Sequence, residues 1–315
     1  MFRVTFLGTG GSIPQTRRNP SAVMVEFEGD RLLFDCGEGT QRQMMRHGTG
    51  FGVDAIFVSH LHGDHVLGIP GLIQTWSFQG RDAPLTIYGP PGSTSALRDC
   101  VHLTGHEPDY PVTVTTLADG DAVDRSGYTV AAVGTEHDAA SSVGYALREE
   151  ERKGRFDREA ALDLGVPEGP LFSRLHDGET VELDDGTVVE PEDVVGEPRR
   201  GRSMVYTGDT RPTERVVAAA EDAELLVHDG MFADDMEDRA RRTGHSTARE
   251  AADVAARAGV ELLALTHVSS RYADGVDALE REARDRFAEA VVAEDGTEIV
   301  VEYPEKDRET RVVSG

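Results

Sequence analysis

Three histidines and one aspartate fall within six residues of one another, directly after a short apolar segment. The apolar residues 55–58 lead into Ser-His-Leu-His-Gly-Asp-His at positions 59–65. Side chains two positions apart on an extended backbone share a face, and Gly63 permits a tight reversal of the chain. Neutral imidazoles and carboxylates suit Zn²⁺, which binds about four ligands at roughly 2.0 to 2.2 Å. A single histidine is more often a solvated or hydrogen-bonded side chain, but this spacing predicts a metal site formed by His60, His62, Asp64 and His65.

Three more polar residues could complete a site for two ions. Each of His137, Asp209 and His267 comes shortly after an apolar segment that we interpret as a strand. Ligands of α/β proteins bind at the carboxyl ends of strands, and a carboxylate can bridge two ions about 3.5 to 4 Å apart. Each residue alone could equally be a capping residue. Together with the run at 59–65 they predict a binuclear site in which Asp209 is the bridge.

Short apolar segments rich in Val, Ile, Leu and Phe recur along the chain. In the first half they follow one another with turns between them, and in the second half they alternate with helical patterns. This order predicts an α/β fold of two mixed sheets packed face to face with helices outside. We expect strands at 4–7, 22–27, 32–34, 55–58, 85–88, 112–117, 129–133, 143–147, 203–206, 224–227, 262–265 and 299–301, and helices at 213–221, 247–258 and 276–290.

One stretch, at about 149–200, interrupts this alternation and has the composition of an insertion. It combines two basic runs with a Gly- and Pro-rich run at 165–170, among many acidic residues. The length of 315 residues is compatible with one large α/β domain. We therefore predict one main domain formed by 1–148 and 201–315, with 149–200 as an excursion. A solvated surface hairpin remains open as an alternative for that excursion.

The chain is strongly acidic, with a net charge of −26 from 58 acidic and 32 basic side chains. Nearly all the basic residues are arginine. This composition suggests a halophile, because in concentrated salt the Debye length falls to about 3 Å or less and repulsion between carboxylates is screened. Strong acidity would ordinarily argue against a polyanionic partner. In high salt that argument is weak, since repulsion and attraction are both screened. Whether a polyanion can bind then depends on where the arginines lie.

The first residues and the cysteines give no sign of secretion or of a membrane. The opening Met-Phe-Arg-Val-Thr-Phe-Leu begins a strand, and no window approaches about 18 apolar residues. Cys36 and Cys100 are too few for a disulfide framework, so we expect them to be small buried hydrophobes. The sequence predicts a soluble, cytoplasmic protein without a membrane partner.

The spacing of the candidate ligands resembles the metallo-β-lactamase superfamily, whose signature is an H-x-H-x-D-H run with a later His, Asp and His. The resemblance implies the αββα sandwich, which agrees with the expected strands. It also implies two Zn²⁺ ions per subunit. One would be held by His60, His62, His137 and Asp209, and the other by Asp64, His65, Asp209 and His267.

Further segments are similar to the ribonuclease Z family within that superfamily. The match runs in order over nearly the whole chain. It implies a zinc-dependent endoribonuclease that trims the 3′ trailer of precursor tRNA by attack of metal-activated water on a phosphodiester, leaving a 3′-hydroxyl. The matching segments are Phe-Leu-Gly-Thr-Gly-Gly-Ser at 6–12, Gly-Ile-Pro-Gly-Leu at 68–72, Thr-Gly-Asp-Thr at 207–210, Gly-His-Ser-Thr at 244–247 and Thr-His-Val-Ser-Ser-Arg-Tyr at 266–272.

The same resemblance implies catalytic roles for three residues. Asp64, beside the attacking water, would be the base. His245 of the His-Ser-Thr motif would face the leaving 3′ oxygen, oriented by a carboxylate from a His-Glu-Ala-Thr motif. This chain has His-Asp-Gly-Met at 228–231 instead, so Asp229 must reach the ring with a side chain one methylene shorter. Two plainer interpretations remain: His245 caps the following helix, and His228 is a hydrogen-bonding neighbour of the site.

The family also implies where RNA would bind. After the first glycine turn it has Pro-x-Lys-x-Arg-Asn, where this chain has Pro-Gln-Thr-Arg-Arg-Asn. Arg17 and Arg18 could contact substrate phosphates, or they could be a solvated pair. The excursion at 149–200 stands where the family carries a flexible arm whose Gly-Pro tip, here Gly169 and Pro170, grips the tRNA.

A homodimer is a further implication of the family, in which the arm of one subunit would hold the precursor tRNA that the other subunit cuts. Two rival functions remain open. A hydrolase of small esters would share the ligands and lack the arm. A catalytically idle RNA-binding protein is disfavoured because every candidate ligand is retained.

Overall fold

The computed structural model describes residues 1–105, 107–303 and 310–314. The chain divides into two compact units. The larger, here called the body, consists of Met1–Arg148 and Arg202–Gly315, and the smaller, here called the arm, is Glu149–Gly201. The second boundary thus falls one residue later than the sequence suggested.

One sheet of the body has eight strands. Strands β1, β2 and β3 form an antiparallel meander, and β4, β5 and β6 continue from β3 in parallel. The parallel half brings the carboxyl ends of β3 and β4 to the same end of the sheet. In spatial order the strands are β17 (Arg311–Ser314), β16 (Glu298–Val300), β1 (Phe2–Gly8), β2 (Ala22–Phe27), β3 (Asp30–Phe34), β4 (Ala55–Phe57), β5 (Leu85–Gly89) and β6 (Val112–Thr116).

The other sheet has seven strands and is also mixed. Strands β12, β13, β14 and β15 run parallel, and β9 pairs antiparallel with β12. The carboxyl ends of β12, β13 and β14 therefore lie together, where α/β proteins place their ligands. In spatial order the strands are β15 (Ala290–Val292), β14 (Leu262–Thr266), β13 (Leu225–Asp229), β12 (Ser203–Tyr206), β9 (Val143–Glu149), β8 (Tyr128–Gly134) and β7 (Ala122–Arg125).

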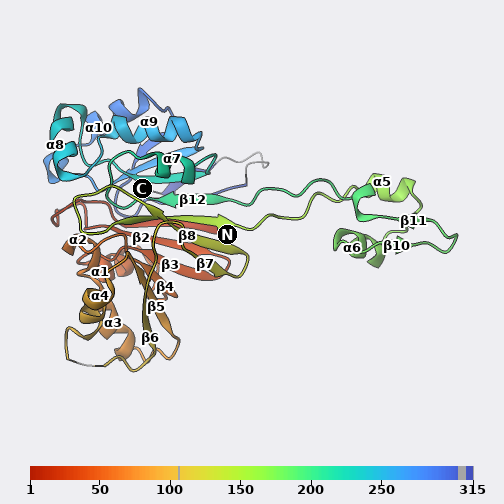
Figure 1. Cartoon of the computed structure of the whole chain (residues 1–315), viewed down its shortest axis with the longest axis horizontal. Coiled ribbons are helices and arrows are strands. Elements are labelled where there is room, and N and C mark those ends of the chain that lie inside the picture. Colours follow the sequence, from red (N-terminus) through yellow and green to blue (C-terminus); the bar gives the residue numbers. More distant parts are fainter. Residues whose placement is uncertain (106, 304–309, 315) are drawn as a thin grey trace. The chain divides into compact units, whose positions relative to one another are not determined.

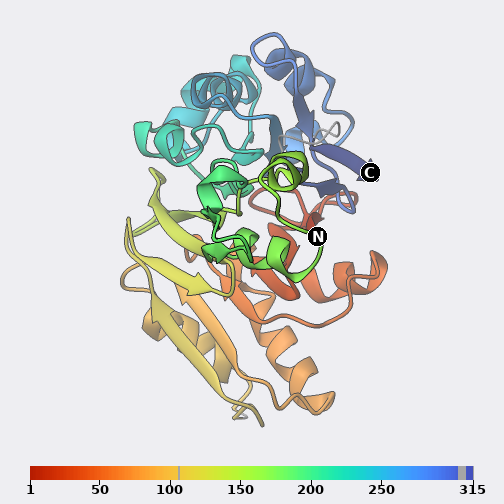
Figure 2. The same cartoon turned by 90° about the vertical axis from the view of Figure 1, so that its right-hand side faces the viewer.

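The two sheets enclose a core of aromatic and aliphatic side chains, which includes Phe34, Phe57 and Tyr145. A second apolar cluster joins the seven-stranded sheet to α7, α9 and α10, and a third joins the eight-stranded sheet to α1, α3 and α4. Figures 1 and 2 show these two groups of helices on opposite sides of the sheets. The predicted αββα sandwich is confirmed.

The helices of the body are short, and none in the described residues is long and apolar enough to cross a membrane. Their bounds are α1 (Thr40–Arg46), α2 (Gly63–Val66), α3 (Ile69–Phe78), α4 (Thr94–His102), α7 (Glu214–Ala219), α8 (Glu237–Thr243), α9 (Ala248–Ala258) and α10 (Asp277–Arg284), with single 3₁₀ turns at Asp234–Met236 and Ser270–Tyr272.

Some sequence predictions of these elements were wrong. The helix expected at 276–290 ends at Arg284, and the last residue of that range begins strand β15. Helices α1, α3 and α4 were not predicted. In α3 the first turn is Ile-Pro-Gly, which propensity alone assigns to a turn, and burial of Leu72 and Trp76 stabilises the helix instead.

The arm has secondary structure of its own, which the sequence did not predict. It contains α5 (Arg158–Asp163), α6 (Pro170–His176), a hairpin of β10 (Val181–Glu182) and β11 (Val188–Val189), and a 3₁₀ turn at Pro191–Asp193. The Asp157 side chain caps α5 by accepting a hydrogen bond from Ala160 N at 2.9 Å. The apolar cluster of the arm has six buried side chains, Ala161, Val166, Leu175, Val181, Val189 and Val194.

Candidate metal centre

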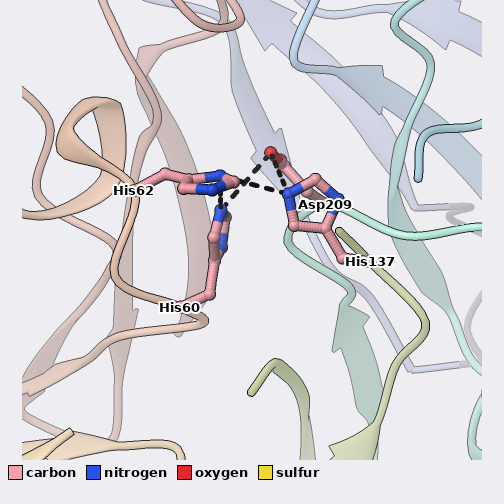
Figure 3. Close-up of side chains that lie close together, drawn as sticks. All are labelled: His60, His62, His137 and Asp209. Atoms are coloured by element: carbon pink, nitrogen blue, oxygen red, sulfur yellow. Dashed lines mark hydrogen bonds and ion pairs between the residues drawn. The ribbon is translucent and has the colours of Figure 1, made fainter. Parts of the chain in front are cut away.

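The seven candidate ligands meet at one end of the body although they come from four separate stretches of the chain. The run at 59–65 follows β4, whereas His137, Asp209 and His267 follow β8, β12 and β14. All seven belong to groups of side chains whose ligand atoms lie within 4.8 Å of one another. Figure 3 shows one such group, with the rings and the carboxylate pointing at one another from three different loops.

The first group consists of His60, His62, His137 and Asp209. His62 Nδ1 lies 3.0 Å from His60 Nε2 and 3.2 Å from His137 Nε2. Asp209 Oδ2 lies 3.6 Å from His60 Nε2 and 3.7 Å from His137 Nε2. Four potential donor atoms therefore surround one small space.

The second group consists of Asp64, His65 and His267, and it shares the Asp209 carboxylate with the first. His267 Nε2 lies 3.2 Å from both Asp64 Oδ2 and Asp209 Oδ2. His65 Nε2 lies 3.3 Å from Asp209 Oδ2 and 3.6 Å from Asp64 Oδ2. Asp209 thus stands between the two groups, which is the position expected of a bridging carboxylate.

Hydrogen bonds do not satisfy all of the potential donor atoms, and the chemistry of these atoms suits metal cations. His65 Nε2 and Asp209 Oδ1 are buried and have no hydrogen-bond partner in the described residues. Leaving a buried polar atom unpaired costs about 1 to 3 kcal/mol, so such atoms normally have a partner. Burial, reinforced by the charge of His65, holds the pKa of His60 well below its usual range, which keeps that ring neutral. Neutral imidazoles and carboxylates arranged in this way suit Zn²⁺.

A buried carboxylate that the sequence analysis missed, Asp35, orients one of these rings. Its Oδ2 accepts hydrogen bonds from His65 Nδ1 at 2.7 Å, Ser59 Oγ at 2.7 Å and the Tyr206 hydroxyl at 2.6 Å. Because Nδ1 of His65 is committed to Asp35, its Nε2 is directed into the ligand cluster. Asp35 directly follows β3, so the strand-end argument that selected Asp209 applied to it as well.

The Asp64 carboxylate is fixed by the loop that follows β1. Ser12 N donates a hydrogen bond to Asp64 Oδ2 at 2.7 Å. Burial opposes ionisation of Asp64, but the hydrogen bond from His267 and the charge of His65 hold its pKa below the usual range. The reversal expected at Gly63 is simply the first turn of α2, and the glycine does not adopt a left-handed conformation.

His245 and Asp229 form a buried pair, and with Asp209 and His267 they make a further group of neighbouring donor atoms. His245 Nδ1 lies 2.8 Å from Asp229 Oδ2, so the shorter acidic side chain does reach the ring. The Asp229 carboxylate also accepts hydrogen bonds from the backbone N–H groups of Thr210 and Met231. Although burial opposes protonation of His245, the charge of Asp229 raises its pKa to about 9. His245 Nδ1 is 4.0 Å from Asp209 Oδ2, which puts this pair at the candidate metal centre.

The plainer interpretations of two histidines have different outcomes. The N-cap of α9 is Thr247, whose side chain accepts a hydrogen bond from Glu250 N, so His245 does not cap the helix. His228 is buried, its Nδ1 bonds to Asp229 O at 2.8 Å, and it joins none of the ligand groups found among the described residues. It is a neighbour of the site.

Arg211 and Glu250 hold the His245 backbone, and the sequence analysis identified neither. The Arg211 guanidinium donates to His245 O at 2.5 Å and pairs with both carboxylate oxygens of Glu250. Glu250 also accepts a hydrogen bond from Thr247 N at 2.9 Å, which completes a capping box. The Thr-x-x-Glu spacing of that box was visible in the sequence and could have indicated Glu250.

The four RNA-contact candidates lie in different environments. Arg18 is buried, and its guanidinium donates to Thr9 Oγ1 at 2.8 Å and to Ala293 O at 2.5 Å. It therefore anchors its own loop, whereas the neighbouring Arg17 is exposed. In the arm, Gly169 and Pro170 are also exposed, and Pro170 begins α6.

Two curated proteins that are similar to this chain over nearly its full length are both named ribonuclease Z. It is 60% identical over 307 residues to ribonuclease Z of Halorubrum lacusprofundi, which covers 97% of this chain and 99% of that protein. It is 59% identical over 306 residues to ribonuclease Z of Natronomonas pharaonis, with 96% and 99% covered. Both relatives come from halophilic archaea, which agrees with the acidic composition.

Solved structures support the same grouping. The short form of human tRNase Z matches with a TM-score of 0.69 and 28% identity, covering 95% of this chain and 99% of that one. The metallo-β-lactamase fold protein YhfI from Bacillus subtilis matches with a TM-score of 0.67 and 21% identity, covering 94% and 98%, which supports the fold alone. Two family models match parts of the chain, the anti-Pycsar protein Apyc1 at residues 2–152 and the beta-lactamase superfamily domain at residues 186–268.

Proposed function

The chain belongs to the ribonuclease Z family of the metallo-β-lactamase superfamily, and from that premise we propose that it removes the 3′ trailer from precursor tRNA, leaving a 3′-hydroxyl. Hydrolysis of a phosphodiester needs an activated water, neutralised phosphoryl charge and a proton for the leaving oxygen. The observation that carries the proposal is the His245–Asp229 pair beside the shared Asp209 carboxylate, because it combines a proton donor with a metal centre.

We assign two Zn²⁺ ions per subunit to the ligand groups. The unpartnered His65 Nε2 and Asp209 Oδ1 support this assignment. When bound, the ions would lower the pKa of a water molecule to about 7 and offset the charge of the phosphoryl group. The residues that would hold them are His60, His62, His137 and Asp209 for one ion, and Asp64, His65, Asp209 and His267 for the other.

The side chains around the metal centre would move the protons. Asp64, held by Ser12 N–H, would accept a proton from the attacking water. The water oxygen would bond to phosphorus while the bond between phosphorus and the 3′ oxygen breaks. His245 would donate its Nε2 proton to that leaving oxygen, because its Nδ1 is committed to Asp229. Beside bound cations the pKa of His245 would fall from its raised value toward neutrality, where a general acid is most effective.

The arm would bind the tRNA without taking part in the chemistry. Its exposed Gly169 has φ of 143°, a conformation that favours glycine, and the rigid Pro170 follows it. Such a tip can approach an RNA surface closely. The same proposal includes a homodimer, in which the arm of one subunit serves the centre of the other, and a cytoplasmic location.

The test uses purified, zinc-loaded protein and a 3′-extended precursor tRNA labelled at its 5′ end, in molar KCl. The proposal predicts one cut at the end of the acceptor stem and a 3′-hydroxyl on the product. Asp209→Ala is the matched control and should not cut. Hydrolysis of a small diester without any cut in the tRNA would favour the small-ester hydrolase. Binding without cutting would favour the idle RNA-binding protein.

A further inference from the structure

Three arginines beside the first glycine-rich loop, Arg17, Arg42 and Arg46, form a cluster without counterions, and we propose that this cluster binds backbone phosphates of the RNA substrate. The inference rests on the proposed function and extends it. The family resemblance already offered Arg17 as a phosphate contact, and the inference adds Arg42 and Arg46 of α1 to it.

The cluster is built from two elements around one hollow of about 180 Å³. Arg17 comes from the loop after β1, and Arg42 and Arg46 lie one helical turn apart on α1. All three are exposed. Within the part of the chain that the structure describes, their guanidinium groups take part in no hydrogen bond and no ion pair.

Several exposed arginines elsewhere on this acidic surface pair with a carboxylate. Arg174 pairs with Glu179 at 2.8 Å, and Arg249 pairs with Asp234 at 2.5 Å. With a net charge of −26, carboxylates are plentiful for any exposed guanidinium. Three unpaired guanidinium groups in one hollow therefore leave a local positive potential that an anion can use.

The single carboxylate among the residues lining this hollow, Asp295, is already fully engaged. Its Oδ1 accepts hydrogen bonds from Thr9 N and Thr9 Oγ1 at 3.0 and 2.8 Å. Its Oδ2 accepts from Asn19 N at 2.7 Å and from Gln43 Nε2 at 2.5 Å. Arg17 and Arg46 also line an adjoining hollow of about 740 Å³, which contains the carboxylates of Asp274, Asp277 and Glu294. Of the two hollows, the smaller one combines all three arginines with a single carboxylate.

The helix itself does not explain these arginines. Arg42 lies in the first turn of α1, where the helix dipole disfavours a cation, and that turn contains no acidic residue. Arg42 and Arg46 also repel each other as like charges four positions apart, at a cost of about 0.2 to 0.5 kcal/mol. Arg46 alone, in the last turn, is favoured by the dipole. A phosphate between the two side chains would remove the repulsion.

The hollow is tied to the metal centre by the loop that lines it. Gln15 of this loop donates to the backbone oxygen of Val268, the residue after His267, at 2.9 Å. Ser12 of the same loop donates to Asp64 Oδ2 at 2.7 Å. An anion in the hollow is thus one short loop away from the candidate ligands, which indicates phosphates of the RNA strand near the cut.

The test compares two double variants in an Asp209→Ala background, which binds without cutting. Arg42→Ala with Arg46→Ala removes two of the three guanidinium groups of the cluster, and Arg98→Ala with Arg281→Ala removes the same charge from exposed sites on α4 and α10. Affinity for fluorescent 3′-extended precursor tRNA is measured by anisotropy over a range of KCl concentrations. Circular dichroism establishes that each protein is folded at each concentration.

The cluster variant should bind precursor tRNA about tenfold more weakly, and its plot of log affinity against log salt should be shallower by about 1.4, since each single-strand phosphate contact contributes about 0.7. The control variant should match the parent protein. In the active enzyme, which keeps Asp209, the Arg42→Ala and Arg46→Ala changes should leave the hydrolysis of a small diester unchanged.

Equal affinity and equal salt slope in the cluster and control variants would overturn the inference. If the protein neither binds nor cuts precursor tRNA, the proposed function itself fails, which is a different result. Inorganic phosphate at constant ionic strength distinguishes the remaining source of the ligand. If phosphate binding depends on Arg42 and Arg46 while tRNA affinity does not, the hollow serves free phosphate and the RNA assignment is wrong.

Discussion

The body and the arm are stabilised in different ways. Three apolar clusters join the sheets and helices of the body, whereas one cluster of six buried side chains holds the arm. The polar interior of the body contains the Asp35 network, with hydrogen bonds of 2.6 to 2.7 Å. The arm relies on exposed ion pairs such as Arg174–Glu179, each worth about 0 to 1 kcal/mol. Fixed geometry is therefore concentrated where the proposed chemistry needs it.

Charge separates the two units as well. The arm has 16 acidic and 7 basic side chains, so net charge gives it no attraction for RNA. The body carries the unpaired cluster of Arg17, Arg42 and Arg46 close to the metal centre. The comparison suggests that the body contributes chemistry and salt-sensitive phosphate contacts, while the arm contributes shape-dependent binding. Four substitutions probe this division, in order of decreasing effect.

The largest effect is expected from Asp209→Ala in the body. Loss of the shared carboxylate removes a ligand from both groups, so turnover of every substrate should fall by several orders of magnitude while the fold remains. Metal analysis and circular dichroism of the variant provide the check. Two bound ions together with full activity would contradict the bridging role.

His245→Ala should slow RNA cleavage by about 10² to 10⁴-fold, the usual contribution of a general acid, without changing the metal content. A nitrophenyl phosphodiester has a much better leaving group and needs less protonation. Its hydrolysis should therefore fall far less. Equal losses for RNA and for the activated diester would show that His245 does not protonate the leaving oxygen.

Asp35→Asn should weaken metal binding by about 10- to 100-fold, because the amide no longer accepts the His65 hydrogen bond as a carboxylate does. Asparagine tolerates the positive φ of 56° at this position, so the backbone should keep its conformation. Asp30→Asn at the other end of β3 also alters a tyrosine contact and serves as the control. Competition with a metal indicator measures the metal affinity of both variants. Equal affinities would show that Asp35 does not orient His65 for metal binding.

Leu175→Ala acts on the arm and should have the smallest effect on chemistry. Truncating a buried leucine lowers the free energy of unfolding by about 2 to 5 kcal/mol. This is a large loss for a core of six buried side chains. Hydrogen exchange should rise throughout the arm, with hydrolysis of small diesters unchanged. Leu164→Ala, which alters an exposed leucine of the arm, is the control. A matching loss of protection in the body would mean that the two units do not unfold independently.

The candidate ligands could be predicted from the sequence because the relevant signals are local. The run at 59–65 has its spacing in the sequence itself, and Asp209 and His267 stand at the ends of strongly apolar strands. Asp35 was missed although it follows the same rule. The layers of the body were predictable for a similar reason, since buried strands and amphipathic helices carry their periodicity with them.

Other features depend on contacts between distant residues and could not be predicted. Short helices such as α1 and α3 are stabilised by packing rather than by propensity. From the sequence, Arg17 and Arg18 were considered as a pair. The structure shows that Arg18 is buried and anchors its loop, whereas Arg17 is exposed. Whether Arg42 has a counterion is a matter of distances in space, and no spacing rule gives it.

The division between body and arm is tested most directly by removing the arm. Arg152 and Arg199 form two backbone hydrogen bonds of 2.8 Å, and Gly154 lies against Gly196, so residues 155–195 can be replaced there by a short linker. The measurement is kcat and KM for precursor tRNA and for a small diester, in the deleted and intact proteins, both folded and zinc-loaded at the same salt concentration. The account predicts a strongly raised KM for precursor tRNA and unchanged diester hydrolysis, because contacts equal in ground and transition states affect binding rather than turnover. Equal RNA affinity in the two proteins would contradict it.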